Sequence, residues 1–488
     1  MATKPPPDAQ TSWQPARLIP VVGIRGQEEQ ERRATSALLA VMGAVPEFGR
    51  ALLRDVGAPK GRISTFTEIQ LKDADGKVSI PDGAIVVEWG KTRWQALVEV
   101  KTGSASLGAE QVGRYLDMAK EHGFAAVLTI SNAITANASD IPFSVDRRKT
   151  RRVDLFHLSW WRIITDAVFQ HRFRGVSDPD QQWILGELLA YLEHENSGAS
   201  GFEDMGESWV KARDGARHGT LRPSDAEVRA VCERWAQLID YLSLGLSQEL
   251  GREVAPVRPR AQTSAERLDG LVQGLAGNGT LADGLRVPDA VGILGLCANL
   301  HAQQLTTSVA LDAPKKGGPQ TRINWLLRQL AAAPPEVTVE VSFAGIRETS
   351  ALLLREAREY PHRLLCASDP KREPRSFSLA MTRKMGLQRG RGAGSFVRET
   401  RNQMLAFYGE VVQGLKPWQP SAPKLPIDSD VVGPPEAVPA GPVEPGEGVA
   451  QGASSSDQLP QSISSPYPLL LNRGPTADPT RKAWLDQG

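Results

Sequence analysis

The chain has 488 residues, of which 41% are hydrophobic, and its formal net charge at pH 7 is +1. This length suits two or three domains, and the near-neutral charge does not by itself indicate a nucleic-acid partner. No apolar run approaches the roughly 18 residues of a membrane span, and the polar, proline-rich start lacks the order of a signal peptide, so we expect no membrane partner. The three cysteines, Cys232, Cys297 and Cys366, lie far apart and in no metal-binding spacing. They predict reduced thiols in a cytoplasmic protein.

The composition divides the chain into five segments: a flexible N-terminus (1–20), a region of alternating helical and strand patterns (21–175), a helical extension (176–215), a separate α+β domain of unknown role (222–418) and a tail (419–488). From Pro417 onward, 14 of the chain's 35 prolines occur among many Gly and Ser residues. Such a segment cannot bury enough apolar surface to fold, so we expect the tail to be disordered.

The first folded segment begins with an amphipathic helix over 28–45, whose apolar stripe consists of Leu38, Val41, Met42 and Val45. An alternating strand pattern follows over 64–71. After a hairpin described below, the pattern predicts a helix over 106–122. The continuous apolar run over 125–130 is typical of a buried strand.

The hairpin lies between Asp82 and Lys101. β-branched and aromatic residues flank the pair Gly90-Lys91, and a two-residue Gly-X loop is typical of a tight type II′ turn. With this turn, Trp89 pairs with Thr92, and the register follows along both strands. One face is then uniformly apolar and is expected to be core; it consists of Ile85, Val87, Trp89, Trp94, Ala96, Val98 and Val100.

The same register brings two carboxylates together on the other face. Asp82 falls opposite Glu99, and Lys101 shares the face of Glu99. Carboxylates opposed at about 5 Å between Cβ atoms repel each other, so the pair needs a proton, a cation or open water. Their oxygens, with the backbone carbonyl of Val100, suit Mg²⁺ or Mn²⁺. A nearby lysine could position or help to deprotonate a metal-bound water, which completes the parts for phosphodiester hydrolysis.

An acid two residues before a lysine is by itself a weak signal. The chain contains three such triplets, at Asp75, Glu99 and Asp369. Asp75 lies in an expected turn and Asp369 beside a proline, whereas Glu99 lies inside an apolar strand with an acid placed opposite. The hairpin geometry therefore favours Glu99.

The order helix, three strands, helix and strand, with Pro81-Asp82, Glu99-x-Lys101 and Gln111-x-x-x-Tyr115, resembles the PD-(D/E)XK nuclease superfamily. The Gln-x-x-x-Tyr element is similar to that of its RecB-like branch, and the resemblance spans roughly residues 25–135. It implies an α/β fold with a restriction-endonuclease-like αβββαβ core.

Residue by residue, the resemblance implies Asp82 and Glu99 as metal ligands and Lys101 as the catalytic lysine. Gln111 and Tyr115 would line the site, although their spacing also fits an ordinary amphipathic helix.

The resemblance further implies an acid on the first helix, for which the candidates are Glu28, Glu29 and Glu31. Glu31 is preferred because it precedes Leu38 by seven residues and so lies near the inward stripe. The alternative is a solvated helix start beside Arg32 and Arg33.

Downstream, the cationic run formed by Arg147, Arg148, Lys149, Arg151 and Arg152 is either a solvated loop or a patch that tracks phosphates. Trp160 and Trp161 follow; stacking on bases is one use of such side chains, but core packing is favoured.

The remaining patterns lie in the α+β domain and carry no recognisable chemistry. They predict an opening helix (225–250), a loop-rich stretch (251–285), strands (306–312, 337–344, 363–367 and 376–382) and further helices (320–332, 350–358 and 396–415).

The sequence thus favours a Mg²⁺- or Mn²⁺-dependent nuclease acting on DNA, with RNA as an open alternative, in repair, restriction, phage defence or a stress response. Two other functions stay open. One is a catalytically silent nuclease fold that binds nucleic acid or regulates. The other is a protein-interaction scaffold whose C-terminal domain contacts a partner. The sequence does not distinguish endonuclease from exonuclease cleavage. It also leaves the oligomeric state open, with a homodimer as one option.

Overall fold

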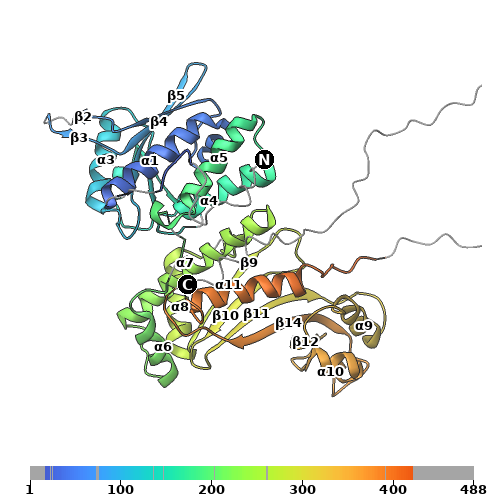
Figure 1. Ribbon diagram of the computed structural model, residues 1–488. Helices are drawn as coiled ribbons and strands as arrows, with labels where there is room; N and C mark the ends of the chain where they lie inside the picture. Colours follow the sequence, from blue (N-terminus) through green and yellow to red (C-terminus); the bar gives the residue numbers. More distant parts are fainter. Residues whose placement is uncertain are drawn as a thin grey trace, which may run out of the picture. The chain divides into compact units, whose positions relative to one another are not determined.

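The computed structural model describes residues 17–21, 24, 26–72, 76–135, 137–146, 148–199, 201–202, 204–259, 262–390 and 392–420 (Figure 1). The compact part of the chain ends at Gln419. Most of the expected flexible N-terminus, up to Ala16, lies outside the described residues, and so does the expected disordered tail from Ser421 onward.

The N-terminal part of the chain contains a five-stranded mixed sheet of order β1-β4-β5-β6-β7. Its strands are β1 (Arg62–Thr67), β4 (Gly83–Trp89), β5 (Thr92–Val100), β6 (Ala126–Ser131) and β7 (Asp154–Ser159). The pairs β1–β4 and β4–β5 are antiparallel, whereas β5–β6 and β6–β7 are parallel. Because a parallel pair needs a crossover connection, the helix α3 (Ala109–Glu121) between β5 and β6 follows from the topology.

Helices cover both faces of this sheet. On one face lie α1 (Gln27–Ala44), α2 (Pro46–Arg54), α4 (Trp160–Val168) and α5 (Pro179–Leu192). Val87 and Val98 belong to their apolar cluster, whereas Leu97 and Val127 pack with α3 on the other face. Since successive residues of a strand point to opposite faces, covering both faces explains why apolar residues follow one another along the central strands, as over 96–98 and 126–128. The prediction of an α/β fold, with helices on a sheet, is confirmed.

The predicted helix over 28–45 is confirmed as α1, and its stripe from Leu38 to Val45 is buried. The strand expected over 125–130 is β6, and the helix expected over 106–122 begins later, at Ala109. The strand expected over 64–71 is divided between β1 and β2 (Leu71–Lys72), and β2 forms a two-stranded ribbon with β3 (Val78–Ser79).

The hairpin register is confirmed, with Trp89 paired to Thr92 and Glu88 to Arg93. Gly90 has a φ of +59°, which the first central position of a type II′ turn requires. The expectation that Trp89 is core is wrong, because its side chain is 68% exposed. The tip of this hairpin projects beyond the helices that cover the sheet, so the apolar pattern continues past the core (Figure 1).

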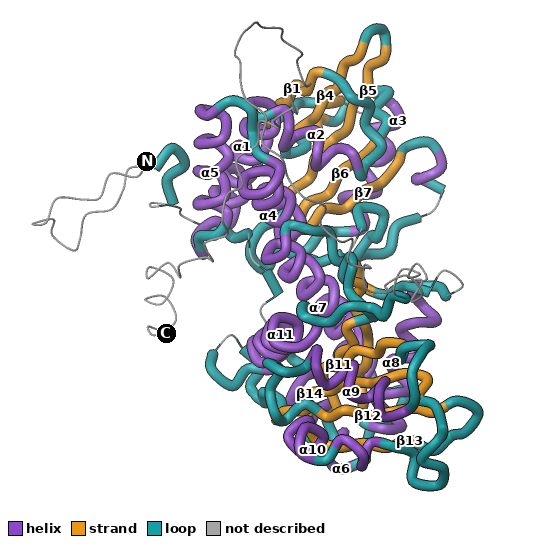
Figure 2. The backbone as a smooth tube through the Cα atoms, turned by 90° about the vertical axis from the view of Figure 1, so that its right-hand side faces the viewer, coloured by secondary structure: helices purple, strands orange, loops and turns teal. Residues whose placement is uncertain are grey.

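The C-terminal part contains a seven-stranded antiparallel sheet of order β13-β12-β14-β11-β10-β9-β8. Its strands are β8 (Ala255–Pro256), β9 (Thr280–Arg286), β10 (Leu294–Asn299), β11 (Gln304–Asp312), β12 (Thr338–Phe343), β13 (Thr349–Leu353) and β14 (Pro374–Lys384). The accompanying helices are α6 (Trp209–His218), α7 (Ala226–Leu250), α8 (Ser264–Asn278), α9 (Pro319–Gln329), α10 (Leu354–Glu359) and α11 (Phe396–Phe407). Figure 2 shows strands and helices of both parts by colour. Burial alternates along β10 and β12, so one face of this sheet carries the core.

Several expectations for this part are wrong. The stretch 251–285 contains α8 and β9; the Thr263–Glu266 capping box marks the start of α8, but its glycines weaken the apolar pattern. No strand lies over 363–367, where a 3-10 turn begins at Pro361. The helix expected over 350–358 is a strand as far as Leu353, because these residues pair with β12.

The expected helical extension contains α5 and α6. Leu185, Leu188 and Leu192 of α5 are buried in the apolar cluster of α1, whereas α6 packs against α7. Within the described residues, no single helix is long and apolar enough to cross a membrane, and α1 with α2 meets that length and composition only as a pair bent by 108°.

Candidate active site

The predicted catalytic residues meet at one end of the β4–β5 pair. Asp82 directly precedes β4, Glu99 is the penultimate residue of β5, and Lys101 follows β5. The last paired residues are Gly83 and Val98, so Asp82 and Glu99 are next in register. The Val100 N–H donates to Asp82 Oδ2 over 2.7 Å, which fixes the Asp82 carboxylate against β5.

The Lys101 ammonium lies among oxygen atoms from two elements. Its Nζ is 2.9 Å from Glu99 Oε1 and 3.1 Å from the Val100 carbonyl oxygen, both on β5. Glu31 Oε2 of α1 is 3.3 Å from the same nitrogen. The structure therefore brings the first-helix acid, the strand acid and the lysine together.

Among the first-helix candidates, Glu31 contacts Lys101, whereas Glu28 and Glu29 form ion pairs with Arg32 and Arg33 one turn further along α1. Glu31 is also largely buried, with 16% of its side chain exposed. The solvated interpretation of Glu31 is therefore wrong.

Gln111 and Tyr115 project from α3 toward the acids. Gln111 Nε2 donates to Glu99 Oε1 over 2.6 Å. Tyr115 is buried in the apolar cluster between α3 and the sheet. Gln111 thus orients Glu99, and the alternative of an ordinary amphipathic helix does not account for its contact.

Burial and like charge determine the protonation of the two carboxylates. Burial, followed by the charge of Asp82, raises the pKa of Glu99 to about 7. Burial also raises the pKa of Asp82, although the hydrogen bond from Val100 opposes it. Two carboxylates this close favour one shared proton or a bound cation.

Lys101 remains an ammonium. Burial lowers the pKa of Lys101, but the charge of Glu99 and its hydrogen bond, with Asp82 and Glu31, outweigh burial and raise it. An ammonium donates hydrogen bonds and stabilises negative charge but accepts no proton. Of the two roles expected for this lysine, its contacts with Glu99 and Glu31 therefore favour positioning of a water over deprotonation of a water.

The residues present fit a divalent cation. Glu99 Oε2 is buried and has no hydrogen-bond partner among the described residues. Together with Asp82 and the Val100 carbonyl it offers the oxygen donors that Mg²⁺ and Mn²⁺ prefer. Within the described residues no group of three or more His, Cys, Asp or Glu side chains is placed to hold a metal ion, and this includes Glu31, Asp82 and Glu99.

Two residues, Trp160 and Gln27, hold the site in place through contacts that the sequence did not indicate. The Trp160 indole N–H donates to the Lys101 carbonyl over 2.9 Å, while the Lys101 N–H donates to the Ile130 carbonyl over 2.8 Å. Trp160 is fully buried, so the favoured core packing is confirmed for it. Gln27 Nε2 donates to Glu31 Oε1 over 3.3 Å and to the Thr102 carbonyl over 3.1 Å. Its spacing four residues before Glu31 is the one signal that could have revealed it.

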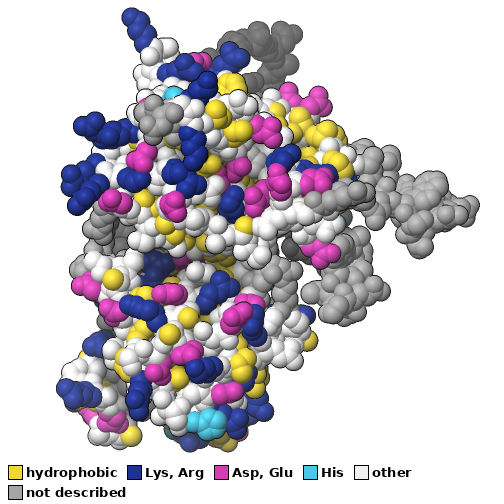
Figure 3. All heavy atoms as spheres, turned by 90° about the vertical axis from the view of Figure 1, so that its left-hand side faces the viewer, with side chains coloured by type: hydrophobic (Ala, Val, Ile, Leu, Met, Phe, Trp, Pro, Cys, Tyr) yellow, Lys and Arg dark blue, Asp and Glu magenta, His cyan; other side chains and the backbone are white. Residues whose placement is uncertain are grey.

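The cationic run divides into two kinds of residue. Lys149 forms an ion pair with Asp117 at 2.5 Å and donates to the Gly113 carbonyl, so it anchors the run to α3. Arg148, Arg151 and Arg152 are exposed, and Arg147 lies outside the described residues. Figure 3 shows one face of the molecule with many Lys and Arg side chains among Asp and Glu, in keeping with the near-neutral net charge.

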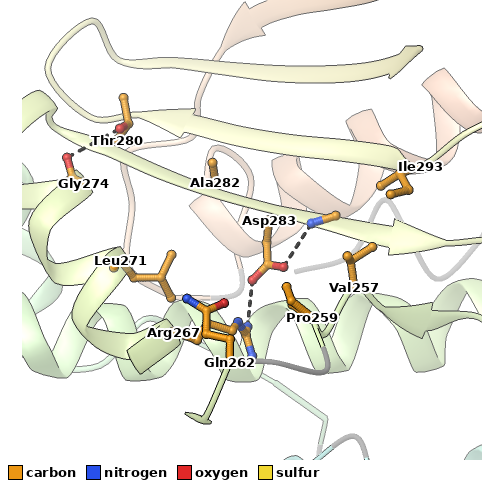
Figure 4. A pocket seen from close by; sticks show the side chains of 12 residues that line it. Val257, Pro259, Gln262, Arg267, Leu271, Gly274, Thr280, Ala282, Asp283 and Ile293 are labelled. Atoms are coloured by element: carbon orange, nitrogen blue, oxygen red, sulfur yellow. Dashed lines mark hydrogen bonds and ion pairs between the residues drawn. The ribbon is translucent and has the colours of Figure 1, made fainter. Parts of the chain in front are cut away.

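A groove of about 460 Å³ lies between α8 and β9 in the C-terminal part (Figure 4). Its two charged side chains form an ion pair, with Arg267 Nη2 2.7 Å from Asp283 Oδ2. The Gly284 N–H donates to the other oxygen of the same carboxylate. None of the predicted catalytic residues lines it. The chemistry expected from the sequence is therefore not located in this groove.

The chain matches no known protein-family model and no curated protein. The nuclease interpretation accordingly depends on the residues and their geometry.

Proposed function

We propose that the N-terminal part of this chain is a Mg²⁺- or Mn²⁺-dependent nuclease with a restriction-endonuclease-like core of the PD-(D/E)XK type. The observation that carries the proposal is the buried Glu99 Oε2, which has no partner among the described residues and lies beside a second carboxylate and an ammonium. Burying a carboxylate oxygen beside a second carboxylate is costly unless a shared proton or a bound cation satisfies it, and the proposal takes the cation.

In the proposed mechanism, each side chain has a separate task. Asp82, Glu99 and the Val100 carbonyl would hold the cation. A divalent cation there would supply Lewis-acid chemistry, polarising the phosphate and lowering the pKa of a water. The Lys101 ammonium stabilises negative charge on the phosphate in the transition state. Gln111 keeps Glu99 oriented through its 2.6 Å hydrogen bond.

DNA is the proposed substrate, in the cytoplasm, with RNA as the alternative to be tested. The exposed side chains of Arg148, Arg151 and Arg152 support a nucleic-acid substrate, because arginine forms bidentate hydrogen bonds with phosphates. A protein partner for the C-terminal part and a homodimer remain proposals.

A metal-dependent cleavage assay tests this function. Supercoiled plasmid and single-stranded DNA and RNA are incubated with the full chain in Mg²⁺, Mn²⁺ or EDTA. We expect cleavage in metal that EDTA abolishes and that Lys101→Ala lowers by about 100-fold or more. Glu88→Ala is the matched control, because Glu88 is an exposed acid on β4 that pairs with Arg93. Undiminished cleavage by Lys101→Ala, or no metal-dependent cleavage of any substrate, would refute the proposal.

A second candidate is a catalytically silent module that binds nucleic acid. The contact of the Lys101 ammonium with Glu99 favours it, because the lysine balances the carboxylates without a metal. This candidate predicts salt-sensitive binding of DNA or RNA without cleavage.

A further inference from the structure

The Lys101 ammonium occupies a position between two sets of oxygens. On one side are Glu99 Oε1 and the Val100 carbonyl, at 2.9 and 3.1 Å, which are two of the donors proposed for the metal. On the other side is Glu31 Oε2, at 3.3 Å. The ammonium thus supplies to Glu99 and Val100 the positive charge that a divalent cation would supply.

An ammonium and a divalent cation cannot share these oxygens at such distances without strong repulsion. Two positive charges about 4 Å apart repel each other even in a partly solvated site. Binding of a metal at Glu99 and Val100 therefore requires the ammonium to give up those contacts. The lysine is 17% exposed, so it needs another anionic partner nearby rather than bulk water.

Glu31 is already held in place to be that partner. Its Oε1 accepts a hydrogen bond from Gln27, and Gln27 also donates to the Thr102 carbonyl next to Lys101. This arrangement fixes α1 to the segment that carries the lysine and leaves Glu31 Oε2 directed at the ammonium.

We propose that Glu31 holds the Lys101 ammonium in an ion pair when a divalent cation binds Glu99 and the Val100 carbonyl. Glu31 is then a positioning residue for the lysine and not a metal ligand. It keeps the ammonium charged and close to the reacting phosphate while reducing its competition for the metal. This inference depends on the proposed metal site.

The two roles of Glu31 predict different coupling to Lys101. If Glu31 holds the lysine, removing its charge returns the ammonium to Glu99 and weakens metal binding only while the lysine is present. If Glu31 is a ligand, the loss of its oxygen charge weakens metal binding whether or not the lysine is present. A double-mutant cycle measures this difference.

The test measures Mn²⁺ affinity of the full chain by calorimetry and by the electron paramagnetic resonance signal of free Mn²⁺. The variants are Glu31→Gln, Lys101→Met and the double variant, with Glu28→Gln as a control for charge removal on the outer side of α1. We expect Lys101→Met to tighten Mn²⁺ binding about tenfold, and Glu31→Gln to weaken it about fivefold in the wild-type background but less than twofold in Lys101→Met. Glu28→Gln should change it less than twofold.

Equal weakening by Glu31→Gln in both backgrounds would overturn the inference and make Glu31 a ligand or a general source of negative charge, with the nuclease proposal left standing. Failure of Mn²⁺ to bind wild type and Lys101→Met alike would instead overturn the proposed metal site and this inference with it. Circular dichroism checks that each variant is folded, and Lys101→Gln replaces Lys101→Met if the latter is not.

Discussion

The two sheets of this chain differ in what they bury. In the N-terminal sheet, Glu99, Thr129 and His157 lie in register across β5, β6 and β7, and all three are buried. In the C-terminal sheet the buried face is mainly apolar, with residues such as Val309 and Leu379. Covering both faces of a sheet buries every position of its central strands, whereas one open face lets polar residues meet water.

The buried polar residues of the N-terminal sheet indicate where a ligand could bind. A buried polar group is costly unless it has a partner, so each one needs an explanation. Thr129 and His157 have theirs, because their side chains contact each other at 3.0 Å and His157 Nε2 lies 2.9 Å from the Ala133 carbonyl. Glu99 keeps one oxygen without a partner in the described structure. Of the three buried polar residues Glu99, Thr129 and His157, Glu99 is therefore the candidate for ligand binding.

The largest expected effect comes from Glu99→Gln, which keeps the shape and the bond from Gln111 but removes a charge from the site. We expect cleavage to fall about 1,000-fold. The metal-free protein should nevertheless gain stability at pH 8. Burial raises the pKa of Glu99 to about 7, so the folded protein favours the protonated side chain. The contribution of Glu99 to folding stability is therefore present at low pH and is lost as pH rises through about 7.

This gain is at most roughly 3.5 kcal/mol, since the pKa rises from 4.5 to about 7 and each unit of pKa shift corresponds to about 1.4 kcal/mol. Urea unfolding at pH 5 and pH 8, in EDTA, measures it. A variant that is less stable than wild type at pH 8 would show that the Glu99 carboxylate is not strained.

Leu379→Ala in β14 should have the opposite pattern. Leu379 is fully buried between β11 and β12, so its truncation should cost about 3 kcal/mol of unfolding free energy. Cleavage measured well below the melting temperature should stay within twofold of wild type. A large loss of cleavage under those conditions would mean that the two parts are not functionally separate.

His157 makes the N-terminal part sensitive to acid. Burial lowers the pKa of His157 to about 4, so the folded protein holds it neutral. Its contribution to stability is present above pH 6.5 and is lost as pH falls from about 6.5 toward 4, by at most roughly 3 kcal/mol. Glu99 has the opposite pH dependence over much of this range, so the quantity to measure is the difference in unfolding free energy between His157→Gln and wild type. This difference should shift in favour of His157→Gln as pH falls from about 6.5 toward 4; a difference that does not change with pH would contradict the assignment.

Trp160→Phe should have the smallest effect on stability. It keeps the buried ring but removes the N–H that holds the Lys101 carbonyl. We expect kcat to fall about tenfold with little change in KM, and stability to fall by about 1 kcal/mol. A change confined to KM would show that Trp160 acts on substrate binding and not on the lysine.

The sequence was sufficient for features that depend on local pattern. The turn at Gly90 determines the β4–β5 register, and from that register the proximity of Asp82 and Glu99 follows. The exposure of Trp89 could not be predicted, because it depends on where the covering helices end. The contact between Trp160 and Lys101 joins residues 59 apart in the chain, and only the packing of α4 brings them together. For the same reason the choice of Glu31 among three acids needed the position of α1.

A crystal structure of the full chain soaked with Mn²⁺, with anomalous scattering used to locate the ion, tests the proposed metal site. We expect a Mn²⁺ peak bound by Asp82, Glu99 and the Val100 carbonyl, with Lys101 moved to Glu31. No anomalous peak at these oxygens at millimolar Mn²⁺, with Lys101 still on Glu99, would contradict it.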